Sequence, residues 1–159
     1  MSTPVQDDRS VRLVRRISAA PSAVYRAWLE PALVRQWLAP GVQVSSVAID
    51  ERVGGAYIVR HTDGNGDVGG FESEIVELVP NSRIVFRWGF AGPASSEGPV
   101  FDSVLTVSLR PDGENATELT LVHDHLGELF AAMPAVAEQV LPGWDLVVGN
   151  LSELLEKDY

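Results

Sequence analysis

The sequence contains no cysteine and little positive charge. Because none of its 159 residues is Cys, disulfides, thiolate nucleophiles and Cys-ligated zinc are excluded. Lys and Arg number 12 against 22 Asp and Glu, which gives a formal net charge of −10. No basic stripe is present to release counterions, so we expect neither nucleic acid nor an anionic membrane surface as a partner.

Long apolar runs and targeting signals are also missing from the sequence. No stretch approaches the roughly 20 apolar residues that a membrane-spanning helix needs. The first ten residues carry Asp7, Asp8 and Arg9 and no apolar run, unlike a secretory signal. We therefore expect a cytoplasmic protein in which residues 1–10 are flexible and residues 11–157 form one domain.

Hydrophobic periodicity predicts one strand, two short helices and then six further strands. The first strand lies within residues 9–18, and Pro21 and Pro31 each suit the first position of a short helix. From residue 42 to 124 the period is two, and the short connections favour an antiparallel meander. Turn signals place its strands near 43–50, 55–62, 69–79, 82–90, 101–110 and 116–124.

A long amphipathic helix is predicted at the C-terminal end. Apolar residues recur at helical spacing from Trp144 to Leu155, and Ala137, Val140 and Leu141 continue the stripe backwards. Pro142 is expected to kink or break the helix, because it lacks an amide donor. A helix of about 15 to 22 residues spans roughly 22 to 33 Å, which is enough to cross a sheet face.

These elements predict an α+β fold in which a seven-stranded curved antiparallel sheet wraps around the C-terminal helix. A sheet of this width twists and curls, and its concave face must be covered by an apolar surface. A curved sheet and a straight helix do not fit along their whole length. We therefore expect a gap between them, lined by inward side chains, as the binding site.

The element order and several short motifs resemble one known family. The order is that of the helix-grip fold shared by START domains and the birch-pollen-allergen superfamily (SRPBCC). Within it, the sequence is similar to the Aha-type family, named after the activator of the heat-shock chaperone ATPase. The similarity spans about residues 11–155 and rests on Ala20-Pro21, Val24-Tyr25, Ala27-Trp28, Pro31, Trp37, Asp50, Gly54-Gly55, Glu74-Ile75, Pro80, Arg83-Ile84-Val85-Phe86-Arg87-Trp88, Gly143-Trp144, Leu151 and Leu155.

The resemblance implies a fold and a hydrophobic cavity rather than one reaction. Members of the family include ligand carriers, cyclases acting on polyketide-like compounds, stress-related proteins and co-chaperones, so the fold does not select a function. The chaperone activator proper has an additional N-terminal domain, whereas about ten residues precede the first predicted strand here. We keep chaperone binding and homodimer formation as alternatives.

Two short motifs resemble metal sites. His123 and His125 form H-x-H, which can chelate zinc, but the local sequence offers no third ligand. Residues 63–74 have the D-x-N-x-D spacing of a calcium loop, but Val68 stands where the sharp turn needs Gly. The same loop spells G-x-G-x-x-G, and a predicted strand follows it where a dinucleotide site needs a helix. We expect no metal and no cofactor.

His123 is the candidate polar group of the interior. We interpret it as a residue of the cavity wall and His125 as a solvent-facing turn residue. The alternative is a general acid or base acting with Glu74 or Asp102 in a cofactor-free cyclase or dehydratase.

The function that we expect is the binding of a small hydrophobic or aromatic molecule between the sheet and the C-terminal helix. Strand alternation and helix spacing select the side chains that face this space, with His61, His123 or the Tyr57 hydroxyl orienting a polar group of the ligand. The predicted lining residues are Tyr57, Val59, His61, Ile84, Phe86, Trp88, Leu105, Val107, Leu121, His123, Trp144, Val148 and Leu151.

Overall fold

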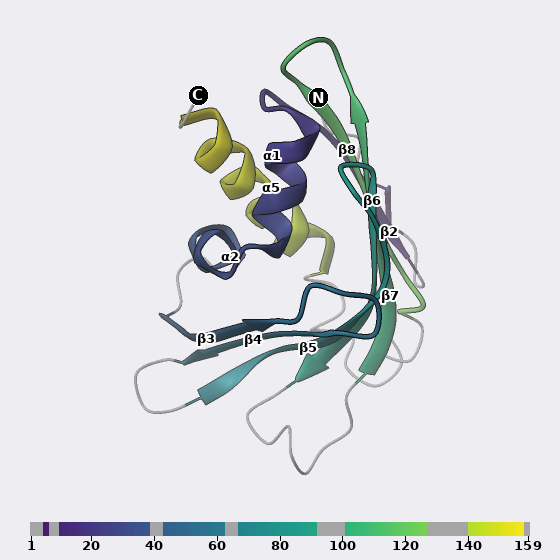
Figure 1. The fold of residues 1–159 in the computed structure, drawn as a ribbon. Helices are drawn as coiled ribbons and strands as arrows, with labels where there is room; N and C mark the ends of the chain where they lie inside the picture. The colour runs from purple at the N-terminus through teal and green to yellow at the C-terminus, as the bar shows by residue number, and fades with distance from the viewer. Residues whose placement is uncertain are drawn as a thin grey trace.

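One curved antiparallel sheet and three helices form the part of the chain that the computed structural model describes (Figure 1). The described residues are 5–6, 10–38, 43–62, 67–91, 101–126 and 140–157. The strands are β1 (Val5–Gln6), β2 (Val11–Ile17), β3 (Gln43–Ile49), β4 (Ala56–Thr62), β5 (Asp67–Val79), β6 (Arg83–Ala91), β7 (Phe101–Pro111) and β8 (Thr117–Asp124). The helices are α1 (Pro21–Leu29), α2 (Pro31–Trp37) and α5 (Val140–Lys157). Across the sheet the strand order is β1-β2-β8-β7-β6-β5-β4-β3.

The predicted fold class is confirmed, because an antiparallel sheet with the expected element order curves around helices on one face. Each of the six meander strands begins and ends within two residues of its predicted bounds. The number of strands differs, since the sheet has eight rather than seven. The additional strand β1 lies in the segment predicted to be flexible, where Val5 pairs with Arg12 and Gln6 with Val11.

β-Bulges bend the sheet on the side formed by β3, β4, β5 and β6. The register of β3 against β4 shifts between Val44 and Ser46, and that of β5 against β6 shifts between Ile75 and Glu77. An extra residue on one strand of a pair increases the local bend and twist. Figure 1 shows α1, α2 and α5 on the concave side of the bent sheet.

The connection between β3 and β4 explains the Asp50 and Gly54-Gly55 part of the family resemblance. Gly54 has a φ of +84°, in the left-handed region that favours glycine. A Cβ at Gly55 would collide with the Asp50 carbonyl oxygen. The Gly54 amide donates to the Ile75 carbonyl at 2.7 Å, which fixes this turn against β5.

Two aromatic side chains satisfy the C-terminal carbonyls of α1. The last carbonyls of a helix have no intrahelical donor and need other partners. The Trp37 indole N–H donates to the Ala27 carbonyl at 3.0 Å, and the Tyr57 hydroxyl donates to the Trp28 carbonyl at 2.7 Å. Both bonds are buried, so they fix α1 against α2 and β4 at once.

Helix α5 runs without interruption through Pro142, so the predicted break at this residue is wrong. Pro142 lies in the first turn of α5 as described, where an amide has no intrahelical acceptor and a proline removes no hydrogen bond. The predicted extension back to Ala137 falls outside the described residues. No helix among the described residues is long and apolar enough to cross a membrane.

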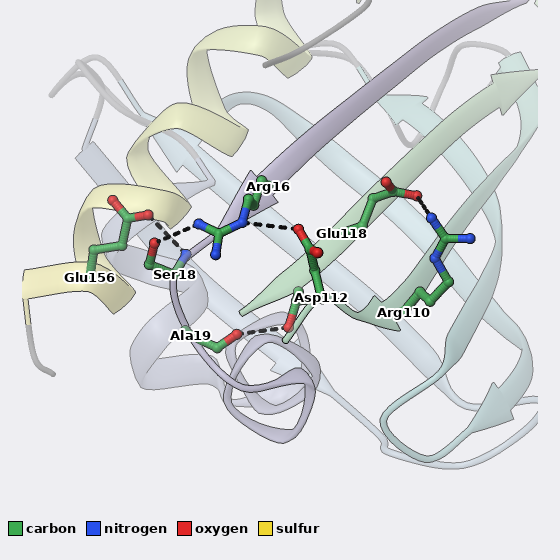
Figure 2. Close-up of polar contacts among 8 residues, drawn as sticks. Arg16, Ser18, Ala19, Arg110, Asp112, Glu118 and Glu156 are labelled. Atoms are coloured by element: carbon green, nitrogen blue, oxygen red, sulfur yellow. Dashed lines mark hydrogen bonds and ion pairs between the residues drawn. The ribbon is translucent and has the colours of Figure 1, made fainter. Parts of the chain in front are cut away.

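Polar contacts surround the segment between β2 and α1, where the C-terminal end of α5 is attached (Figure 2). The Glu156 carboxylate accepts from the Ser18 backbone N–H at 2.9 Å, and the Thr117 hydroxyl donates to the Ala19 carbonyl at 2.7 Å. Beside them, Arg16 forms an exposed ion pair with Asp112 at 2.9 Å. The Glu156 bond attaches the end of α5 to this segment, and α5 lies next to β2, α1 and α2.

Candidate ligand-binding site

The residues predicted to line the ligand site lie together in the interior. Twelve of the thirteen are buried, on β4, β6, β7, β8 and α5. The remaining residue, His61, lies on β4 opposite Gly69, and its side chain is outside what the structure describes. The structure therefore brings the predicted set to one place, and its role in binding a ligand stays a prediction.

Seven ring side chains form the centre of this interior, and we call them the aromatic cluster. Trp144 is 6% exposed, and the other six expose no surface. At these residues the predicted gap is filled by side chains, so a ligand reaches them only by displacing a neighbour. The members are Trp28 of α1, Trp37 of α2, Tyr57 of β4, Phe86 and Trp88 of β6, His123 of β8 and Trp144 of α5.

The rings of the cluster contact one another in an unbroken series. The ring centroids of Trp28 and Trp37 are 4.7 Å apart, and those of Tyr57 and Phe86 are 4.8 Å apart, both in edge-on arrangements. Trp144 joins the two sides, with its centroid 6.0 Å from that of Trp28 and 5.4 Å from that of Trp88. Contacts of this kind add about 0.5–1.5 kcal/mol each beyond the burial of apolar area.

At one end of the cluster a buried chain of hydrogen bonds joins α5 to three strands, and we call it the relay. The Trp144 indole N–H donates to His123 Nδ1 at 2.9 Å. The other ring nitrogen, Nε2, lies 2.6 Å from Ser103 Oγ, and the Ser103 hydroxyl donates to the Trp88 carbonyl at 2.8 Å. The relay therefore links α5, β8, β7 and β6 through Trp144, His123, Ser103 and the backbone of Trp88.

The donors of the relay determine the tautomer of His123. An indole N–H can only donate, so Nδ1 must be the unprotonated nitrogen that accepts from Trp144. The proton of the neutral ring is then on Nε2, which donates to Ser103. Ser103 in turn donates its own proton to the Trp88 carbonyl. Each donor in the relay thus meets one acceptor.

Burial lowers the pKa of the His123 imidazole to about 3, because the charged ring would lose its hydration. The ring is therefore neutral near pH 7, and both of its nitrogens are bonded to protein groups. This arrangement suits a structural residue rather than a general acid or base, which needs a pKa near the working pH and contact with substrate.

His125 has a different environment from His123. It follows the end of β8 with a φ of 61°, and its side chain is exposed. The two histidines therefore do not face a common ion, and the predicted solvent-facing position of His125 is confirmed. Among the described residues, no group of three or more His, Asp or Glu side chains is placed to hold a metal.

On the side of the cluster formed by α1 and β4, two buried polar groups next to Tyr57 have no partner within the described residues. Within the described structure, no acceptor lies within hydrogen-bond distance of the Trp28 indole N–H, and no partner lies within reach of the Ser73 hydroxyl. Ser73 is 4% exposed and is the strand partner of Tyr57 on β5. Trp28 is the residue whose carbonyl accepts from the Tyr57 hydroxyl. We call Trp28, Tyr57 and Ser73 the unpaired end.

The sequence-based site omitted four residues of the aromatic cluster and its two ends. Trp28 and Trp37 were named only among the residues that carry the family resemblance, and Ser73 and Ser103 were not recognised as interior groups. A signal for the serines existed, because both lie in phase with the inward residues of their strands, next to Ile75 and Leu105. Strand alternation does not predict the hydrogen-bond partner of each buried polar group, because the partners are brought together by the fold.

Comparisons with solved structures support a common fold. Protein CV1439 from Chromobacterium violaceum is 30% identical, and the match covers 93% of this chain and 98% of that one with a TM-score of 0.76. Protein Ms6760 from Mycobacterium smegmatis is 18% identical over the whole of both chains with a TM-score of 0.79, which shows the fold alone. No curated protein matches the chain.

A third similar structure is that of DynU16, a protein in the dynemicin biosynthetic locus. It is 26% identical, and the match covers 95% of this chain but 48% of that one, with a TM-score of 0.68.

A family model gives the relationship directly. The model described as activator of Hsp90 ATPase homolog 1-like protein matches residues 18–156, which include α1, α2 and the strands β3 to β8. The matched range also contains every residue of the aromatic cluster and of the relay. The chain therefore belongs to the family of activator of Hsp90 ATPase homolog 1-like proteins, with an SRPBCC-type fold.

Proposed function

We propose that this protein binds one small, uncharged, apolar or aromatic molecule in the interior between the sheet and its helices. The observation that carries the proposal is the aromatic cluster, because seven rings from six elements meet in one buried place. Ring-lined interiors with a few polar groups are typical of small-molecule sites. The family's association with hydrophobic ligands supports the same function.

Binding affinity would come mainly from apolar burial. Each 100 Å² of apolar ligand surface removed from water contributes about 2.5 kcal/mol, against which the cost of ordering the ligand must be set. The described cluster has almost no exposed surface, so the ligand must also replace protein contacts. We therefore expect a molecule of one to three rings rather than a long lipid chain.

A neighbour from a biosynthetic locus favours a small molecule over a macromolecule. DynU16 is related at 26% identity, and this supports the inclusion of natural-product-like ring compounds among the ligands to be tested. The acid–base alternative has less support, since both nitrogens of His123 are bonded within the relay and burial keeps its pKa far below 7.

The test uses N-phenyl-1-naphthylamine, a neutral probe whose emission rises in an apolar environment. We expect saturable binding with one probe per chain, together with energy transfer from tryptophan, because all four tryptophans belong to the cluster. A linear, non-saturating rise in emission or a stoichiometry well above one would contradict an interior site.

Two variants locate the bound probe. Leu105→Phe adds volume next to Phe86, its partner on β6, and is expected to weaken probe binding at least about tenfold. Leu146→Ala is the matched control, because Leu146 is an apolar residue of α5 that is 60% exposed. The Leu146→Ala variant should bind the probe with the same affinity as the original protein. Circular dichroism checks that each variant folds, and equal affinity in a folded Leu105→Phe protein would count against the interior site.

Chaperone binding, homodimer formation and a cytoplasmic location stay predictions of the sequence, as does the absence of a cofactor.

A further inference from the structure

The two ends of the aromatic cluster differ in their unused hydrogen-bonding capacity. In the relay, the Trp144 indole, both His123 nitrogens and the Ser103 hydroxyl all have partners. At the unpaired end, the Trp28 indole N–H and the Ser73 hydroxyl have none within the described structure. A buried donor without an acceptor costs about 1–3 kcal/mol, so native proteins contain few of them.

From this difference we infer that the ligand is a neutral ring compound carrying a carbonyl-type oxygen, which binds at the unpaired end and accepts from the Trp28 indole N–H. This inference rests on the proposed function and adds the chemical class of the ligand and the end of the interior that receives it.

The position of the missing partner follows from what is already paired. The Trp28 carbonyl is used by the Tyr57 hydroxyl, and the Trp37 indole is used by the Ala27 carbonyl. The indole N–H of Trp28 is therefore the donor left over where α1, α2 and β4 meet. A ligand oxygen placed there would gain a bond without breaking one in the protein.

The same comparison explains why the relay is not the receiving end. A ligand polar group could bind at the relay only by displacing Trp144, His123 or Ser103 from a partner. Each displaced group would then be a buried polar atom without a hydrogen bond. The unpaired end carries no such cost, since its two free polar groups have no bond to lose.

The charges of the interior indicate that the ligand is neutral. Besides the Tyr and Trp side chains, the buried polar side chains of the described structure are four hydroxyls and one neutral imidazole, those of Ser73, Ser103, Thr117, Ser152 and His123. No guanidinium, ammonium or carboxylate is among them. A carboxylate ligand would therefore meet no buried counter-ion among the described residues, and burying it unpaired is far more costly than burying a ketone.

A matched set of three probes tests the inference. Tetralin and 1-tetralone share one ring skeleton and differ by a carbonyl oxygen, and 1,2,3,4-tetrahydro-1-naphthoate adds a negative charge. We expect displacement of N-phenyl-1-naphthylamine by 1-tetralone at a concentration about tenfold lower than by tetralin, the size of effect that one buried hydrogen bond gives. The carboxylate should be the weakest of the three.

Two variants assign the preference to Trp28. Trp28→Phe keeps a ring but removes the N–H, and it should reduce the preference for 1-tetralone over tetralin to within about twofold. Ser103→Ala removes a buried hydroxyl from the relay instead, so it should leave that preference unchanged. If Trp28→Phe does not fold, the ratio of the two probes in the original protein still decides the chemical class.

The outcomes separate this inference from the proposed function. Equal binding of tetralin and 1-tetralone would overturn the inference and leave the proposed function standing. Tighter binding of the carboxylate, or a preference that Trp28→Phe retains, would overturn it as well. If the ring probes and N-phenyl-1-naphthylamine all fail to bind, the proposed function is overturned and the inference with it.

Discussion

The relay and the unpaired end lie in the same interior, but they differ in whether their buried polar groups have hydrogen-bond partners. In the relay, Trp144, His123 and Ser103 pass hydrogen bonds from α5 to the backbone of β6. At the unpaired end, the Trp28 indole and the Ser73 hydroxyl are equally buried but have no described partner. Burial alone therefore does not distinguish a structural polar group from one that is available to a ligand.

The largest expected effect concerns the contribution of the relay to stability. Trp144→Ala removes a buried ring and the donor to His123, so it should lower the free energy of unfolding by about 3–5 kcal/mol. Leu146→Ala, two residues along the same helix and 60% exposed, should change it by less than about 0.5 kcal/mol. Urea unfolding followed by circular dichroism measures both. Equal losses would show that α5 is not anchored through Trp144.

The next effect is a pH dependence that belongs to the relay. The pKa of His123 is about 3 in the folded protein and near 6.5 when unfolded, so the unfolded state binds more protons between these values. The contribution of the neutral ring is fully present above about pH 6.5 and is lost progressively as the pH falls toward 3.

Between about pH 7.5 and 5 this linkage should remove about 2 kcal/mol of stability. His123→Gln has no titrating ring, so its loss over the same interval should be smaller by that amount. Denaturant titrations of both proteins at each pH give the difference and cancel the titration of other groups. Identical pH dependence would mean that the ring is hydrated and not held in the relay.

A pair of serine variants compares the two ends directly. Ser103→Ala leaves the Nε2 proton of His123 without an acceptor and should cost about 1–3 kcal/mol. Ser73→Ala removes a buried hydroxyl that has no described partner, so it should be neutral within about 0.5 kcal/mol or stabilising. Thermal unfolding of the two variants decides the point, and a larger loss in Ser73→Ala would reverse the assignment of the ends.

The smallest effect is expected on the surface. Asp112→Asn removes the ion pair with Arg16, in which both side chains are about half exposed (Figure 2). Such pairs contribute about 0–1 kcal/mol, and about 1 M salt should remove the difference from the original protein. A loss as large as that of Ser103→Ala would show that polar contacts at the surface stabilise this fold as much as buried ones.

Most of the fold could be predicted from the sequence because its signals are local. Alternation of apolar residues and the turn residues between them place the strands from 43 to 124, and Pro21 and Pro31 begin the first two helices. Two features were not predicted for physical reasons. Strand β1 has only two residues, too few for a period, and Pro142 is tolerated because of its position in the first turn of α5.

The candidate site was predictable only as a set of inward residues. Alternation places Tyr57, Phe86 and Trp88 in the interior, and their burial agrees with it. The pairing of Trp144 with His123 joins residues 21 positions apart, and that of Tyr57 with Trp28 joins residues 29 apart. Such contacts depend on how α1 and α5 lie on the sheet, so sequence periodicity could not separate the relay from the unpaired end.

The most direct test of this account is the response of the four indole N–H signals to 1-tetralone in ¹H–¹⁵N correlation spectra. Single Trp→Phe variants assign the signals of Trp28, Trp37, Trp88 and Trp144. The account predicts that the Trp28 indole proton moves downfield as it acquires an acceptor, while the Trp144 signal stays where its bond to His123 places it. A spectrum in which Trp144 responds and Trp28 does not would contradict it.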